Sequence, residues 1–332
     1  MIWESINLTN NYSKKCKMVI FLSDVAIKAE DVWKIYNQNH TDEVIALRGL
    51  NLEIKKGTIT TLLGKNGAGK TTFLRIIATQ LIPTKGNISV LGYDVIKDVW
   101  KIREKIAVIP QDAKPLLFPS PLEFISSFLV MRGYSFSDAR KRAKETLSEL
   151  EIPEEYWNRA AWDLSGGYQR RLLLAAVMAS DSELILLDEP SVGLDPIARM
   201  ELWGKITLLK KMGKTVLLTT HYMEEAEMLS DHVIIIDKGK KILEGNPKEL
   251  INSFKWKHKI EVLDECDISL MKKMGVLFGS RPPFVIYLNS SIDSVLEELN
   301  SNGCRASASL TTLEDVFLYA VGEEKWSIIK EE

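Results

Sequence analysis

The 332-residue sequence lacks any apolar run long enough to span a bilayer, and its first residues lack the apolar core of a signal peptide. If the protein serves a membrane, we expect the spanning part to be another chain. Cysteine is also scarce: Cys16, Cys266 and Cys304 match neither a disulfide framework nor a metal-binding spacing. We expect reduced thiols in a cytosolic protein, with Cys266 and Cys304 serving as small apolar residues.

Positive charge is not in excess either. Lysine and arginine number 43 against 45 aspartate and glutamate residues, so the formal net charge is −2. This balance gives no basic footprint, and we expect no nucleic-acid partner. A hydrophobic content of 45% with 27% charged residues is typical of a globular protein with a packed core. The length favours two domains of unequal size.

One stretch, Thr58 to Leu81, organises the chain. It predicts a short apolar strand, a glycine-rich turn and an amphipathic helix, and the turn carries GKNGAGKT from Gly64 to Thr71. Because glycine adopts left-handed conformations, backbone N–H groups of this turn can surround an anion beside the helix N-terminus. Lys70 adds a charge for the β- and γ-phosphates, and Thr71 a hydroxyl for Mg²⁺. The alternative, an ordinary glycine-rich turn, is disfavoured by the flanking strand and helix.

The surrounding segments predict an α/β fold. Two extended segments between Val25 and Ile54 suggest antiparallel β-structure, and Gly86 to Tyr93 suggests another short strand. Fully apolar runs at Leu184–Leu187 and Val216–Thr220 are separated by helical segments. Such runs predict a parallel sheet that is covered on both faces, with polar residues at its carboxyl edge.

Helix-start signals mark a helical region between these runs. Ser120 and Ser135 each precede an acidic residue by three positions, as in a capping box. They predict helices near Pro121–Arg132 and Phe136–Leu150, and a long apolar helix follows Ser165. Three aromatic residues of this region are expected in the core rather than in a docking groove, namely Phe118, Phe124 and Phe128.

The same patterns suggest domain boundaries. We expect a flexible N-terminal extension over residues 1–20, with Met1 and Met18 both as candidate translation starts. The main domain is predicted at residues 21–253, with a helical subdomain at about 112–175. After about Phe254 a strand and helix pattern restarts, which predicts a small C-terminal α+β domain at 254–332 whose role the sequence does not reveal.

Polar residues at predicted strand and helix ends are candidates for chemistry. Asp188, after the Leu184–Leu187 strand, can bind Mg²⁺ or its water, and Glu189 can orient or deprotonate an attacking water. The alternative is a pair of carboxylates that merely begins a loop. Ser165-Gly166-Gly167 before a helix is a second anion-binding end, although such a triplet alone is more often a plain helix cap.

Together these motifs make the chain resemble the nucleotide-binding subunit of ATP-binding-cassette (ABC) transporters over about Ala26 to Leu250. GKNGAGKT matches Walker A, and LILLDEP from Leu184 to Pro190 matches Walker B. The other family motifs follow in order: Gln111 in VIPQD (Q-loop), LSGGYQRR at Leu164–Arg171 (signature), SVGLD at Ser191–Asp195 (D-loop) and His221 (switch histidine).

The resemblance implies a fold and an assembly. The fold is the P-loop NTPase type of ABC nucleotide-binding domain, with a mixed-sheet core, an antiparallel β subdomain and a helical subdomain. Two subunits meet head to tail, as a homodimer or a heterodimer, so that each Walker A faces the other's signature. The implied ligands are ATP and Mg²⁺. The implied partner is a separate transmembrane permease, which would hold this chain on the cytoplasmic face of the cell membrane.

The resemblance also implies roles for individual residues. Glu189 is the implied catalytic base, His221 the γ-phosphate sensor, Gln111 a Mg²⁺ ligand and link to the permease, and Asp195 a coupling residue between the two sites. ATP binding is implied for Tyr36, Gly64, Asn66, Gly67, Ala68, Gly69, Lys70, Thr71 and Thr72. Thr71, Gln111 and Asp188 are the implied Mg²⁺ ligands, and the implied contacts across the dimer are Ser165, which meets the γ-phosphate, Gly166, Gly167 and Gln169.

Some of these residues have a plainer interpretation. Tyr36, which the resemblance sets against adenine, is alternatively a strand aromatic. Gln111 is alternatively a surface polar residue, and a lone histidine such as His221 is more often structural.

Two further segments narrow the resemblance to one branch of the family. SVLGYD and TTLEDVFLYAVGE (Thr311–Glu323) resemble the drug- and polysaccharide-export branch, which implies an exporter. The main alternative is a non-transport ATPase of the superfamily, such as a translation or DNA-repair factor, but no second cassette, coiled coil or zinc module is visible. A third alternative, a regulatory binder without turnover, is disfavoured by Glu189 and His221. The transported substrate stays open, and the transport direction rests on the resemblance alone.

Overall fold

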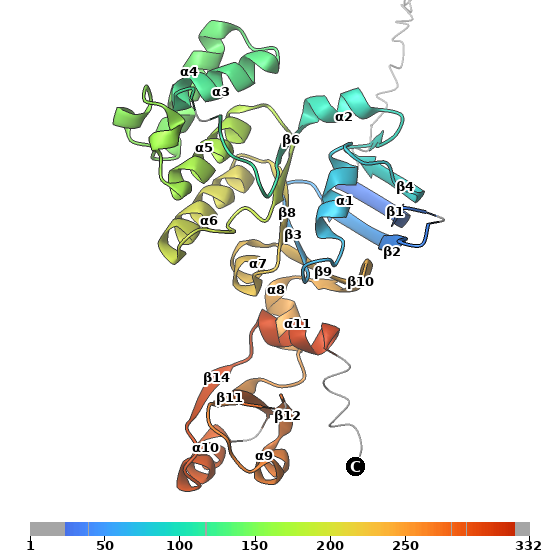
Figure 1. Ribbon diagram of the computed structural model, residues 1–332, viewed down its shortest axis with the longest axis vertical. Coiled ribbons are helices and arrows are strands. Elements are labelled where there is room, and N and C mark those ends of the chain that lie inside the picture. The colour runs from blue at the N-terminus through green and yellow to red at the C-terminus, as the bar shows by residue number, and fades with distance from the viewer. Residues whose placement is uncertain (1–23, 39, 117, 280, 290, 323–332) are drawn as a thin grey trace, which may run out of the picture.

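The computed structural model describes residues 24–322 except 39, 117, 280 and 290. The predicted N-terminal extension, its candidate start Met18 and Cys16 lie outside the described residues. Two sheets and most of the helices form the upper part of the molecule in Figure 1, and a third sheet with two helices lies below.

The central sheet positions the candidate site. It has six strands in the order β10-β9-β3-β8-β7-β6, and only β10 runs antiparallel to its neighbour. Every residue of β3, β7 and β8 is buried, as expected for a sheet that is covered on both faces. The strands are β3 (Ile59–Leu63), β6 (Ile106–Ile109), β7 (Leu184–Asp188), β8 (Thr215–Thr220), β9 (His232–Asp237) and β10 (Lys240–Gly245).

The second sheet is antiparallel, as predicted, in the order β2-β1-β4-β5. It joins the central sheet where the Arg48 N–H donates to the Gly239 carbonyl at 2.9 Å. Helix α1 shares one core with both sheets and buries Phe73 and Ile77 there. The elements are β1 (Val25–Tyr36), β2 (Val44–Lys55), β4 (Lys85–Val90), β5 (Tyr93–Asp94), α1 (Lys70–Ile77) and α2 (Val99–Lys105).

The helical region lies at the upper left of Figure 1. Ser120 caps α3 (Pro121–Met131) in a complete capping box, and Ser135 caps α4 (Phe136–Glu149), so both predicted helix starts are confirmed. Two 3-10 turns, η1 (Glu154–Tyr156) and η2 (Ala161–Asp163), then lead to α5 (Gly166–Ala179). The remaining upper helices are α6 (Pro196–Lys211), α7 (Met223–Leu229) and α8 (Pro247–Ser253).

The expectation for the three aromatic residues of this region is only partly right. Phe124 and Phe128 pack against the core as predicted. Phe118 is 86% exposed, so its placement in the core is wrong. It stands in the connection before α3 rather than on a helix, and its ring meets Trp162, itself exposed, at a centroid distance of 6.4 Å.

The lower sheet has the order β12-β13-β11-β14 and is antiparallel throughout. Its βαββαβ chain order is that of split βαβ folds, and α9 and α10 lie beneath the sheet in Figure 1. The elements are β11 (His258–Val262), α9 (Ile268–Met274), β12 (Val276–Phe278), β13 (Phe284–Leu288), α10 (Ile292–Ser301) and β14 (Ala306–Leu310).

The prediction that Cys266 and Cys304 are free thiols is wrong for this structure, because the two residues form a disulfide. They are 38 residues apart in sequence, which gave no framework signal, but folding brings their Cα atoms to 6.1 Å. Both pack in the core of the small sheet.

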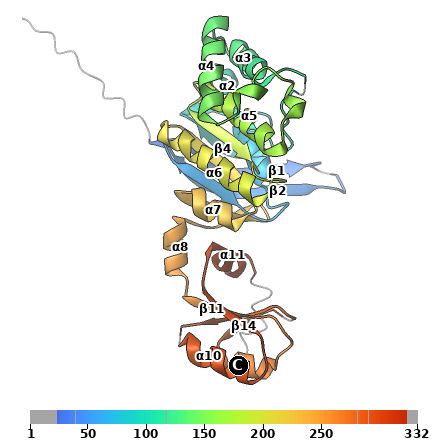
Figure 2. The same ribbon diagram turned by 90° about the vertical axis from the view of Figure 1, so that its left-hand side faces the viewer.

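Helix α11 (Leu313–Val321) leaves the lower sheet and packs against α7 and α8, as Figure 2 shows. Its buried Val316 and Phe317 share one cluster with Leu250 after the central sheet. Asp315 fastens the other side of α11 to the lower sheet, since its carboxylate accepts from the Tyr287 hydroxyl at 2.7 Å and pairs with Lys259 Nζ at 3.2 Å.

We predict that Asp315→Ala loosens α11 from the lower sheet. Asp315 is 1% exposed, and its removal takes one acceptor from the Tyr287 hydroxyl and leaves Lys259 with the more exposed Glu261 as its ion-pair partner, at a cost of about 1–3 kcal/mol. Native-state hydrogen exchange at β11 and β13 should show this loss. Glu314→Ala, at an exposed position of the same helix, is the matched control. Equal protection in the two variants would contradict the assigned role of Asp315.

Candidate functional site

The glycine-rich turn between β3 and α1 is shaped by close backbone approaches. Gly69 has φ +106°, and a Cβ there would stand 2.5 Å from the Ala46 carbonyl oxygen. A Cβ at Gly64 would stand 2.5 Å from the Ile236 carbonyl oxygen. The turn therefore excludes side chains at both positions, where it packs closely against the backbone of two other strands.

Lys70 is folded over this turn. Its Nζ donates to the carbonyl oxygens of Gly64 at 2.8 Å and of Lys65 at 3.2 Å. The residue is only 4% exposed, so its charge needs a partner. Glu189 Oε1 supplies that partner at 3.3 Å.

The carboxyl ends of β7 and β8 bring the predicted acidic residues to this turn. Asp188 ends β7, and its Oδ1 accepts from the Thr71 hydroxyl at 3.1 Å and from the Thr219 hydroxyl. Sequence reasoning missed Thr219. It lies opposite Asp188 in the parallel ladder, and that pairing depends on a strand order that the sequence does not display.

Glu189 is held in a constrained position beside Asp188. Its φ is +47°, which is uncommon for a residue with a side chain, and its N–H donates to the Thr219 carbonyl at 3.0 Å. The side chain is nearly buried, with Oε2 at 2.9 Å from His221 Nδ1. A left-handed residue of this kind costs about 1–3 kcal/mol and is typical of functional sites.

A pocket of about 500 Å³ opens over these groups. Tyr36 at the end of β1 forms one wall, and its hydroxyl lies 3.3 Å from Thr72 Oγ1. Ala68 does not line the pocket but supports it through the backbone, since its carbonyl accepts from Gly239 N–H at 3.0 Å. The lining includes these predicted residues: Tyr36, Asn66, Gly67, Gly69, Lys70, Thr71, Thr72, Gln111 and Glu189.

The predicted signature residues border a different hollow, also of about 500 Å³. Gly166, Gln169 and Gln111 line it, and Gln111 is shared with the first pocket. Ser165 caps α5 through its hydroxyl, which accepts from Tyr168 N–H at 3.4 Å. Ser165 and Gly167 line neither space, so within one chain the signature does not reach the glycine-rich turn.

Asp195 has a local role in the single chain. It is the N-cap of α6, and its Oδ1 accepts from the N–H groups of Ile197 and Ala198, both at 3.0 Å. It is nevertheless exposed, as is Ser165 at the start of α5.

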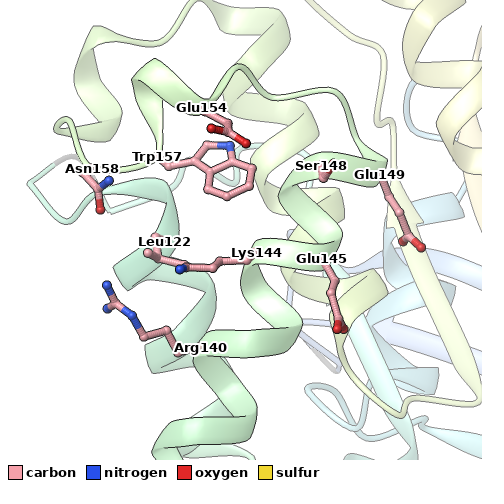
Figure 3. A pocket seen from close by; sticks show the side chains of 9 residues that line it. All are labelled: Leu122, Arg140, Lys144, Glu145, Ser148, Glu149, Glu154, Trp157 and Asn158. Carbon is pink, nitrogen blue, oxygen red and sulfur yellow. The ribbon is translucent and has the colours of Figure 1, made fainter.

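A third and larger hollow, of about 810 Å³, lies in the helical region (Figure 3). Leu122 of α3 and Trp157 supply its apolar surface, while Arg140 and Lys144 of α4 bring positive charge. Three glutamates on the rim bring negative charge: Glu145, Glu149 and Glu154. Sequence reasoning missed this hollow, because its walls come from separate elements.

The chain is similar to known transporter subunits. Residues 47–192 match the family model described as ABC transporter. The chain is 32% identical to the daunorubicin resistance ATP-binding protein DrrA3 of Streptomyces coeruleorubidus over 92% of this chain and 98% of that protein. It is 33% identical to the Nod factor export ATP-binding protein I of Cupriavidus metallidurans over 90% of this chain and 98% of that protein.

Solved structures give a matching result. A dimeric, post-hydrolysis ATP-binding cassette, MJ0796, bound to ADP and Pi, has a TM-score of 0.60 and 29% identity, over 66% of this chain and 98% of that chain. The cbiO1 protein of Clostridium perfringens has a TM-score of 0.62 and 30% identity, over 69% of this chain and 92% of that chain. No helix in the described part of the chain combines the length and apolarity needed to cross a bilayer.

The two glycines of the turn allow a sharp test of its geometry. Gly69→Ala should cost about 1–3 kcal/mol more than Gly67→Ala in the free energy of unfolding, because both have positive φ but only position 69 meets backbone. A Cβ at Gly67 would meet no atom within 4 Å. Urea unfolding without nucleotide measures the difference, and equal losses would contradict the close approach to Ala46.

Proposed function

The chain belongs to the ABC transporter family as an ATP-binding and ATP-hydrolysing subunit, and from this premise we propose that it powers export through a separate transmembrane permease. The observation that carries the proposal is the cluster of Lys70, Glu189 and His221 beside one pocket. Export is supported by the relatives, which are named for drug resistance and for Nod factor export. The chain would then lie on the cytoplasmic face of the membrane.

In this proposal the glycine-rich turn holds the phosphates of ATP. Backbone N–H groups near Gly67 and Gly69 and the N-terminus of α1 would face them, with Lys70 as the counter-charge. The oxygen donors of Thr71, Asp188 and Gln111 fit Mg²⁺, which prefers oxygen ligands and shares its shell with nucleotide phosphates. When bound, that ion would neutralise charge on the phosphate oxygens.

Glu189 is proposed as the catalytic base. Its carboxylate would accept the proton of the attacking water while the bond between the γ-phosphorus and the bridging oxygen breaks, which releases ADP and phosphate. Its contacts with Lys70 and His221 keep its two oxygens in fixed directions. His221 would hold the carboxylate in place and meet the γ-phosphate when ATP fills the pocket.

Two chains would complete each site. Ser165 and Gly166 are exposed at the start of the 14-residue helix α5, which is a suitable end for an anion. A head-to-tail partner would bring this end to the γ-phosphate in the opposite pocket, together with Gly167 and Gln169. The exposed Asp195 would then lie near the interface and couple the two sites. The partner is either a second copy or a related chain.

The proposed base gives a direct prediction. Glu189→Gln should bind ATP but hydrolyse it at least ~100-fold more slowly, because the amide cannot accept the proton. Phosphate release measures turnover, and equilibrium dialysis with labelled ATP measures binding. Glu224→Gln, at an exposed position on α7, is the matched control. Turnover within a few-fold of wild type in Glu189→Gln would remove Glu189 from this role.

We further propose the third hollow as the permease contact. It lies on the helical region, and its lining residues differ from those of both other hollows. The half-buried ring of Trp157, with charges of both signs around it, suits an amphipathic helix of a partner protein. A contact there leaves the hydrolytic residues free to work.

Charge reversal at this hollow should separate assembly from hydrolysis. Arg140→Glu with Lys144→Glu should reduce capture of a multi-span membrane protein from detergent-solubilised native membranes by at least about 10-fold, since both exposed cations face the hollow. ATP turnover of the isolated chain should stay within about 2-fold of wild type. Lys141→Glu, exposed on the same helix but outside the hollow, is the control.

Two outcomes would count against the proposals. Unchanged capture by the double variant would contradict the assignment of the hollow. Capture of ribosomes or nucleic acid by the wild-type chain, with no membrane protein, would overturn the transporter function and favour a non-transport ATPase.

A further inference from the structure

One buried acidic residue has no part in the reaction outlined above. Glu225 lies on α7, the short helix that follows His221, and it is 0% exposed. Its Oε1 accepts two hydrogen bonds, from Ser191 Oγ at 2.6 Å and from Trp203 Nε1 at 3.0 Å. Burying a carboxyl group costs desolvation free energy, so a fully buried glutamate is a candidate for a specific structural role.

The partners of Glu225 come from the segment that leaves β7. Ser191 follows Glu189 by two residues and begins the loop that ends at Asp195. Trp203 lies on α6, the helix that this loop enters, and is itself 7% exposed. Glu225 therefore contacts the first residue of the loop, Ser191, and the middle of the helix that follows the loop, through Trp203.

The hydrogen bond between Ser191 and Glu225 connects the same two segments as the contact between Glu189 and His221. Glu189 Oε2 meets His221 Nδ1 at 2.9 Å, and Ser191 Oγ meets Glu225 Oε1 at 2.6 Å. Both contacts join the segment after β7 to the segment after β8. These two contacts tie the start of the loop that carries Asp195 to the segment that carries His221.

The environment of the carboxyl group agrees with a fixed joint. Burial raises the pKa of Glu225, and the hydrogen bonds from Ser191 and Trp203 oppose that shift. Ser191 is 0% exposed as well, so its hydroxyl has a buried acceptor rather than water as its partner. The joint is thus shielded from solvent on both sides.

We propose that Glu225 is a positioning residue for ATP hydrolysis, which fixes the Ser191–Asp195 loop relative to His221 and so holds Glu189 and His221 in register. This inference rests on the proposed function, because it assigns a support to the same site. Glu225 itself touches neither the nucleotide pocket nor the glycine-rich turn. Its effect is on the geometry of the reacting groups, where displacements of about 1 Å cost up to ~100-fold in rate.

The test compares Glu225→Ala with Glu225→Gln. Gln keeps an oxygen that can accept from Ser191 and Trp203, whereas Ala removes the acceptor. Glu225→Ala should lower kcat by about 10- to 100-fold with KM for ATP within about 3-fold, because the reacting groups lose alignment while the pocket stays intact. Glu225→Gln should stay within about 3-fold of wild-type kcat, and Glu224→Ala should match wild type.

A second variant guards against a general loss of folding. Ser191→Ala removes only one hydrogen bond of the joint and should lower kcat by about 3- to 10-fold, with a smaller loss of thermal midpoint than Glu225→Ala. Combined with Glu225→Ala, it should add less than its separate effect, since both act on one joint. Because Ser191→Ala changes little side-chain volume, its loss of kcat is the outcome that plain core packing does not predict.

Several results would overturn the inference. Folded Glu225→Ala with wild-type kcat would do so, as would Glu225→Gln with the same loss as Glu225→Ala. If Glu225→Ala does not fold, an unchanged kcat in Ser191→Ala has the same consequence. If the wild-type chain hydrolyses ATP while the variants give these results, only the inference about Glu225 is wrong. A folded wild-type chain without ATP turnover would overturn both the inference and the proposed function.

Discussion

The structure depends on how the carboxylate of Glu189 is held. Lys70 Nζ lies 3.3 Å from one oxygen and His221 Nδ1 lies 2.9 Å from the other. Glu189 and His221 directly follow β7 and β8, and Lys70 begins α1 after the turn that follows β3; the three strands are neighbours and run parallel. A nearly buried carboxylate requires such partners, because removing it from water costs several kcal/mol. The parallel sheet meets that requirement by bringing all three strand ends to one edge.

The antiparallel sheet adds a second constraint from the opposite side. Its strand β2 brings the Ala46 carbonyl so close to Gly69 that only glycine fits, and Tyr36 of β1 reaches Thr72. The same sheet is fastened to the central one by Arg48 and Gly239. The pocket over the glycine-rich turn therefore lies between two sheets, and its shape depends on how firmly they are joined.

Much of this could be predicted from the sequence, because local physics decides it. Apolar strands, the glycine-rich turn and the caps at Ser120 and Ser135 each depend on neighbouring residues. The features that the sequence did not predict depend on contacts between residues far apart in the chain. Nothing in MEEAEM indicates which glutamate is buried, since that follows from where Trp203 lies, and Cys266 gives no sign of meeting Cys304. The short strands β6 and β12 offered too few residues for a periodic pattern.

The seven-residue helix α7 connects these features. Its Glu225 points inward to Ser191, while its Glu227 accepts from the Leu313 N–H at 3.2 Å and so caps the first turn of α11. Asp315 of α11 in turn reaches Lys259 and Tyr287 in the lower sheet. Helix α7 thus contacts both α11 and the loop after β7, and it follows His221 closely in the chain. The C-terminal sheet is therefore joined, through α11 and α7, to the segment that follows His221 by hydrogen bonds and an ion pair.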